Sequence, residues 1–101
     1  MSFMTTVKRT LRGGKPRAQA TREVSGAACF WVNNGPILCS LRDLHTALGV
    51  MTKKQFEHHA REQRNDFALW ASGVFADKAL AVKLRRAKTP AGMRRALAPY
   101  L

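Results

Sequence analysis

The residues best suited to chemistry lie in one short stretch, FEHHAREQRNDFALW, at residues 56–70. An imidazole beside a carboxylate can act as a general acid or base, and histidine is also a common metal ligand. The competing interpretation is structural. Helical spacing places His59 one turn from Phe56 on the core-facing side, so its ring can bond to the cap of the next helix, with Trp70 packed beside it. We favour this interpretation and predict a structural corner formed by Phe56, His59, Asn65, Asp66, Phe67 and Trp70.

The sequence predicts no cofactor, no metal site and no catalytic activity. A structural zinc site needs four ligands with short paired spacings, whereas His58 and His59 are adjacent and diverge by about 100° on a helix. No nucleophile motif and no phosphate-binding loop is present. The residue types for a nucleophile, a base and an orienting acid occur at Cys39, Ser40, His45, His59, Asp43 and Asp66.

Electric charge is the strongest feature of the composition. The chain has 18 basic and 6 acidic residues, which give a formal net charge of +12. Residues 1–27 carry six basic side chains and one acid, residues 28–77 carry five of each, and residues 78–101 carry seven basic side chains and no acid. The alternative is a basic face that is only solvated, but solubility needs a net charge of only about 2–8 on a small domain. The asymmetry therefore favours a polyanionic partner.

Two regions are predicted to contact phosphates. Near the C-terminus, helical spacing turns the basic side chains away from the apolar ones, and the predicted contacts are Lys78, Arg85, Arg86, Arg94 and Arg95. Residues 1–27 mix glycine, proline and charge, so we expect a flexible basic arm that cannot bury enough surface to fold. Its predicted contacts are Lys8, Arg9, Arg12, Lys15 and Arg17. The same acid-poor composition weakly resembles an organelle-targeting presequence.

Residues 29–39, CFWVNNGPILC, predict two short strands around a turn. A two-residue type I′ turn at Asn34 and Gly35 would point Cys29 and Cys39 to opposite faces, so they could not form a disulfide. A three-residue loop would place the two cysteines opposite each other. Because the N-terminus lacks the apolar run of a secretory signal, we favour two reduced thiols in a cytoplasmic protein.

Capping signals divide the rest of the chain into short helices. The predicted N-caps are Ser40, Thr52, Asn65, Asp77 and Thr89. Gln55 would complete a capping box with Thr52, and Pro90 suits the first position of the last helix. Gly49 is predicted to end the first helix in a left-handed conformation.

Three segments carry a resemblance to a known family: FWVNNGPILCSLRDLHTAL, FEHHA and NDFALWASGVFADKALAVKL. They resemble a small prokaryotic domain of unknown function. Its members share an aromatic-rich hairpin, a Leu-rich helix, an F-x-x-H step, and an N-D-F-x-x-W helix followed by a D-x-x-L-A step. These positions are Phe56, His59, Asn65, Asp66, Phe67, Trp70, Asp77, Leu80 and Ala81. The resemblance implies the fold and transfers no activity.

We therefore expect a mostly α fold, with a short β-hairpin packed on a bundle of four or five short helices in residues 28–101. The predicted core is Phe30, Val32, Leu38, Leu41, Leu44, Leu48, Phe56, Phe67, Trp70, Val74, Leu80 and Leu84. We expect a non-enzymatic protein that binds DNA or RNA through phosphates with little sequence specificity. The alternative is a protein-interaction or accessory module, with an acidic protein as partner or an exposed Trp31 as interface. The sequence contains no run of about 18 apolar residues, so no membrane span is predicted.

Overall fold

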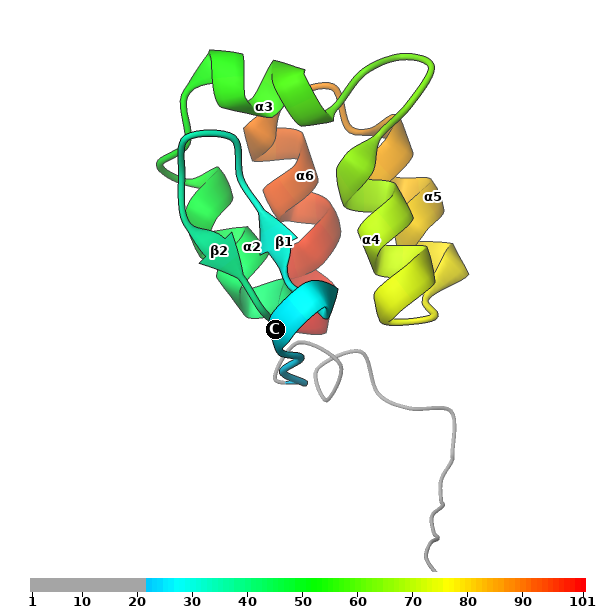
Figure 1. Ribbon diagram of the computed structural model, residues 1–101. Helices are drawn as coiled ribbons and strands as arrows, with labels where there is room; N and C mark the ends of the chain where they lie inside the picture. Colours follow the sequence, from blue (N-terminus) through cyan, green and yellow to red (C-terminus); the bar gives the residue numbers. More distant parts are fainter. Residues whose placement is uncertain (1–21) are drawn as a thin grey trace, which may run out of the picture.

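The computed structural model describes residues 22–101. Within this range the elements are η2 (Gly26–Ala28), β1 (Phe30–Trp31), β2 (Ile37–Leu38), α2 (Leu41–Leu48), α3 (Lys53–His59), α4 (Asp66–Val74), α5 (Lys78–Arg86), α6 (Pro90–Leu97) and η3 (Ala98–Tyr100). Helices α4 and α5 form one pair and α2 packs on α6, while α5 also contacts α6 and β2 lies against α2 (Figure 1). This confirms the predicted mostly α fold with a short hairpin. None of the helices in residues 22–101 is both long enough and apolar enough to span a membrane.

Every predicted N-cap forms its hydrogen bond, and each accepts from the backbone N–H three residues later. At α3 the capping box is complete, because Gln55 Oε1 accepts the Thr52 N–H at 2.8 Å. The amide of Gln55 also donates to the carbonyls of Asn33 (3.0 Å) and Asn34 (3.1 Å), which ties α3 to the hairpin loop. One expectation at a helix end is wrong: Gly49 has a φ of −73°, in the right-handed region.

The hairpin has a three-residue loop, the second of the two turns that the sequence left open. Phe30 pairs with Leu38 and Trp31 with Ile37, which leaves residues 33–35 in the loop. Asn34 alone takes the left-handed conformation there (φ 56°). Gly35 is needed for a close approach instead, since a Cβ would lie 2.9 Å from Val32 Cγ1.

This register places Cys29 opposite Cys39, and the two form a disulfide. The prediction of two reduced thiols is therefore contradicted. The physical reason is the period of two along a strand, because a shift of one residue in the pairing turns the two sulfur atoms from opposite faces to the same face.

The last residues of the predicted arm belong to the folded domain. The Val24 N–H donates to the Cys39 carbonyl at 2.8 Å, and Val24 packs against the core. Residues 26–28 then form η2, which leads into the hairpin. The predicted arm residues Lys8, Arg9, Arg12, Lys15 and Arg17 lie outside the described residues.

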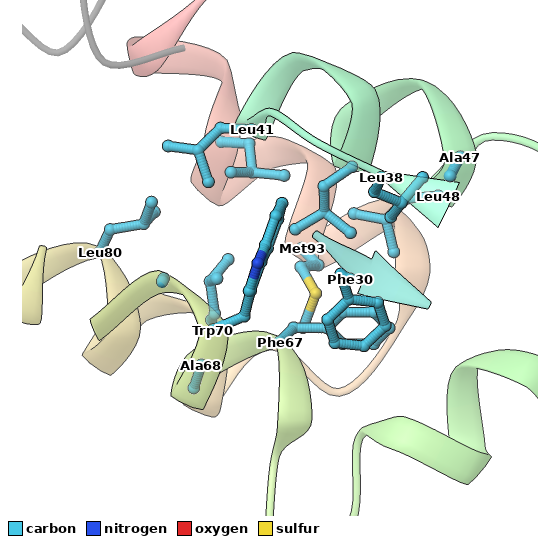
Figure 2. Close-up of a cluster of buried hydrophobic side chains, with 14 of the residues drawn as sticks. Phe30, Leu38, Leu41, Ala47, Leu48, Phe67, Ala68, Trp70, Leu80 and Met93 are labelled. Atoms are coloured by element: carbon cyan, nitrogen blue, oxygen red, sulfur yellow. The ribbon is translucent and has the colours of Figure 1, made fainter. Parts of the chain in front are cut away.

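The core lies where α4, the hairpin, α2 and α6 meet (Figure 2). Phe30 reaches Phe67 and Trp70 of α4, with Met93 of α6 beside them. All predicted core residues are buried except Val74, which is partly buried against the same cluster. The structure adds Ala47, Ala68, Ala71, Phe75, Ala81, Met93, Leu97 and Tyr100 to the predicted core.

Candidate nucleic-acid interface

His59, at the C-terminal end of α3, is buried and has a hydrogen-bond partner at each ring nitrogen. Its Nδ1 lies 3.0 Å from Oδ2 of Asp66, and its Nε2 accepts the Asn33 N–H at 3.0 Å. Because a backbone N–H can only donate, Nε2 carries no proton and Nδ1–H donates to the carboxylate. Both nitrogens are thus engaged, and neither is open to a metal ion or a substrate proton.

Asn65 and Asp66 form the other side of this corner. Asn65 Oδ1 accepts a hydrogen bond in the first turn of α4 (3.0 Å), and its Nδ2 donates to the Leu84 carbonyl (3.3 Å). One buried side chain therefore caps α4 and ties it to α5. Asp66 also accepts from Arg64 Nε at 3.0 Å.

The aromatic side chains of the stretch form a second layer over the corner. The Phe67 ring stacks on Phe30 (5.0 Å) and on Phe56 (5.9 Å). The indole N–H of Trp70 donates to the Ala28 carbonyl at 2.7 Å. Trp70 does not pack beside His59 as expected from the sequence. Phe30 contacts the Trp70 ring, with the ring centroids 5.6 Å apart, and the His59 ring, with the centroids 4.8 Å apart.

Substituting Asn65 by alanine tests the corner. The change removes the cap of α4 and leaves the Leu84 carbonyl without its side-chain donor. We expect a loss of about 2 kcal/mol in the free energy of unfolding, measured by urea denaturation. Gln63→Ala, in the exposed loop before the corner, should change stability by less than about 0.5 kcal/mol. Equal stabilities of the two variants would contradict the assigned role of Asn65.

The other residues considered for catalysis have structural partners. Cys39 is in the disulfide, and Ser40 Oγ accepts the Asp43 N–H at 3.0 Å as the cap of α2. The Asp43 carboxylate accepts the Cys39 N–H at 3.0 Å. In the described part of the chain, no group of three or more His, Cys, Asp or Glu residues could hold a metal ion.

The basic side chains of the last two helices are exposed, and α5 packs against α6. With Lys88, which lies between these helices, residues 78–101 carry seven basic side chains, and none of them forms an ion pair with an acid in residues 22–101. Residues 1–21 contain no Asp or Glu. Lys83 has a different partner, the Tyr100 ring, whose centroid lies 6.0 Å from its Nζ. Lys78 and Arg86 lie exposed on α5, outside the two concave regions described next.

Three of the predicted contacts, Arg85, Arg94 and Arg95, lie in two concave regions. Arg94 and Arg95 line a groove of about 620 Å³ between α2 and α6, which we call the α2–α6 groove. Arg85 lines a smaller cavity of about 310 Å³, together with Lys88 and Arg61. The sequence did not indicate that Arg61 joins this surface, because it lies in the α3–α4 connection and only the fold brings it to Arg85.

His45 of α2 also lines the α2–α6 groove, whereas the sequence indicated it only as a residue type suited to catalysis. Its carbonyl accepts from Arg94 Nε at 3.2 Å. Partial burial lowers the pKa of His45, and the positive charges of Arg94 and Arg42 lower it further. The ring is therefore neutral at pH 7, in surroundings of positive potential.

Comparison with protein families, with curated proteins and with solved structures finds no match for this chain. The resemblance to the small prokaryotic domain therefore stays a prediction.

Proposed function

We propose that the chain is a non-enzymatic nucleic-acid-binding protein that contacts phosphates with little sequence specificity. The observation that carries the proposal is the set of seven exposed cations in residues 78–101, none of which forms an ion pair with an acid in residues 22–101. Like charges gathered on two packed helices oppose folding through mutual repulsion. A phosphate backbone relieves that repulsion and releases counterions when it binds.

Three acids of the domain have partners of their own, while Glu62 lines the smaller cavity together with Arg85 and Lys88. Asp77 caps α5 through Leu80 N–H (2.9 Å). Asp66 belongs to the corner, and Glu57 lies 3.9 Å from Lys53. The exposed basic side chains of α5 and α6 form no ion pair in residues 22–101, which leaves them available to an external anion.

The proposal includes no reading of bases. Exposed Lys and Arg side chains suit phosphates, which repeat along the backbone regardless of sequence. The basic residues of the predicted arm would add to the same nonspecific contact. The absence of catalysis is also part of the proposal, and it is supported by the structural partners of His59, Cys39 and Ser40 described above.

The test is a titration of fluorescent duplex DNA and single-stranded RNA with the full chain, between about 50 and 200 mM salt. The wild type should bind both, more weakly as salt rises. A variant with Lys78, Arg85, Arg86, Arg94 and Arg95 changed to alanine should lose most of its affinity. On duplex DNA, its slope of log affinity against log salt should fall by about 4 to 5, because each phosphate contact contributes about 0.9.

A matched pair of variants locates the interface. Two double variants each remove two adjacent, exposed positive charges from one helix. The first is Arg85→Ala/Arg86→Ala in α5, and the second is Lys53→Ala/Lys54→Ala in α3. The first should weaken binding clearly more than the second. Equal losses would show that net charge matters and the surface of α5 and α6 does not. A wild type that binds neither nucleic acid at low salt would end the proposal.

A second candidate function, a protein-interaction or accessory module, is favoured by one observation. Trp31 is 68% exposed and Ile37, its partner across the hairpin, is 50% exposed. Exposed aromatic and aliphatic side chains that face outward together are typical of interfaces. If nucleic acid does not bind, capture of partners with the wild type but not with Trp31→Ser would support this function.

The cytoplasmic location stays a prediction, as does targeting to an organelle through the basic arm. The disulfide weighs against the cytoplasm, because disulfides persist mainly in oxidising compartments.

A further inference from the structure

The α2–α6 groove has the size of a small-ligand site and an amphipathic lining. Its volume of about 620 Å³ lies within the roughly 300–1,000 Å³ typical of ligand pockets. Leu48, Pro90 and Ala98 supply apolar surface, and the cations are Arg94 and Arg95. No acidic residue lines it. A ligand that fits this lining has an apolar body and a negative charge.

Both guanidinium groups lie close to backbone. Arg94 Nε donates to the His45 carbonyl at 3.2 Å, and a Cβ at Gly49 would lie 3.5 Å from Arg94 Cζ. A Cβ at Gly92 would lie 3.6 Å from Arg95 Nη2. One cation is therefore anchored over the end of α2 and the other lies over the first turn of α6. A guanidinium plane can bond a phosphate or stack on a base.

The electrostatics of the groove favour an anion. No acid in residues 22–101 forms an ion pair with Arg94 or Arg95, and the neighbouring His45 is kept neutral partly by Arg94. Two arginines without an ion pair on one groove repel each other, and a bound anion would relieve that repulsion. The charge thus complements a phosphate, and the apolar surface complements a nucleobase.

We infer that the α2–α6 groove holds one unpaired nucleotide of a bound strand, so that the protein prefers single-stranded to duplex nucleic acid. This inference rests on the proposed function and adds to it the form of the ligand. The backbone charge alone predicts the opposite preference, because the salt slope per phosphate is about −0.9 for duplex DNA and about −0.7 for a single strand. A preference for the single strand requires a contact with a base, and bases inside a duplex are stacked and out of reach.

The experiment compares a fluorescent 16-nucleotide DNA of mixed sequence with the same strand in a duplex, at one moderate salt concentration. The wild type should bind the single strand about tenfold more tightly, because an arginine of the groove can stack on an unpaired base. Ala91→Leu/Ala98→Leu fills the groove with aliphatic side chains and leaves the charge unchanged. Its affinity for the single strand should fall about tenfold, so that the preference disappears.

Leu69→Phe is the control, since Leu69 is exposed on α4 and does not line the groove. It should keep the wild-type preference, and circular dichroism should show equal helix content in all three proteins. If the wild type binds duplex as tightly as single strand, or the filled groove keeps the preference, the inference is overturned and the proposed function stands. If the wild type binds neither ligand, both fail.

Discussion

Replacing Phe67 by alanine should lower the free energy of unfolding by about 3–5 kcal/mol, the usual cost of deleting a buried phenyl ring. Phe67 is fully buried, and it stacks on Phe30 and Phe56 from two directions. The ring also meets the edge of His59 at 5.5 Å. Its removal leaves a cavity at the centre of the molecule, lined by rigid rings that cannot collapse into the space.

The measurement is guanidinium denaturation followed by circular dichroism. Leu69→Ala, two positions along α4, is the matched control because Leu69 is 47% exposed. We expect a change below about 1 kcal/mol there, as for surface positions in general. Since single domains are typically stable by only about 5–15 kcal/mol, Phe67→Ala should remove a large share of the total. A loss no larger than that of Leu69→Ala would contradict the assigned core.

The helices could be predicted from the sequence because their signals are local. A cap joins a side chain to a backbone N–H three residues later, so Thr52 with Gln55 and Thr89 with Pro90 carry the information within one turn. The same holds for His59 and Asp66, which lie seven residues apart and meet across a short connection. The described structure forms each predicted N-cap.

Phe75 shows what the helical pattern misses. It is eight positions after Phe67, but it follows the last residue of α4, so the turn after the helix decides where its ring lies. Ala76 then takes a left-handed conformation (φ 55°), and the Asp77 N–H returns to the Ala71 carbonyl at 3.1 Å. This turn directs the Phe75 ring onto Trp70 (5.0 Å). Alanine is an uncommon residue in that conformation, so no local signal predicted it.

The positive charge of the candidate interface could be predicted from the sequence, but the concave regions on it could not. Counting residues is enough to show that the C-terminal quarter is basic. The α2–α6 groove, however, joins His45 to Arg94, which are 49 positions apart. Helical periodicity predicts the exposed face of each helix, but it does not predict which two helices will lie side by side.

The strand pairing of the hairpin could not be predicted from the sequence, because it depends on whether the loop has two or three residues. One additional loop residue changes every cross-strand pair, and only tertiary contacts decide between the two registers. Here the three-residue loop is held by Gln55, which donates to both Asn33 and Asn34. With this register, the side chains of Phe30 and Leu38 face the core together, and those of Trp31 and Ile37 face solvent.

The disulfide should therefore contribute strongly to stability, and Cys29→Ser/Cys39→Ser should lower the free energy of unfolding by about 2–4 kcal/mol. The two cysteines are 10 positions apart, so their bond closes a short loop in the unfolded chain. Strands of two residues each have little pairing of their own, and an isolated two-stranded hairpin is at best marginally stable. Residues 24–28 are anchored next to the bond, since the Val24 N–H donates to the Cys39 carbonyl at 2.8 Å.

Two comparisons separate the bond itself from the loss of sulfur. Reductant should lower the denaturation midpoint of the wild type toward that of the double variant, and it should leave the double variant unchanged. A wild type that does not respond to reductant, with a free-thiol assay that finds two reactive cysteines before treatment, would show that the hairpin is held by its packing alone. The contact of Phe30 with Phe67, Trp70 and His59 would then have to hold β1 in place. In that case Phe67→Ala should release the hairpin as well as open the core, and the solvent accessibility of Trp31 would report it.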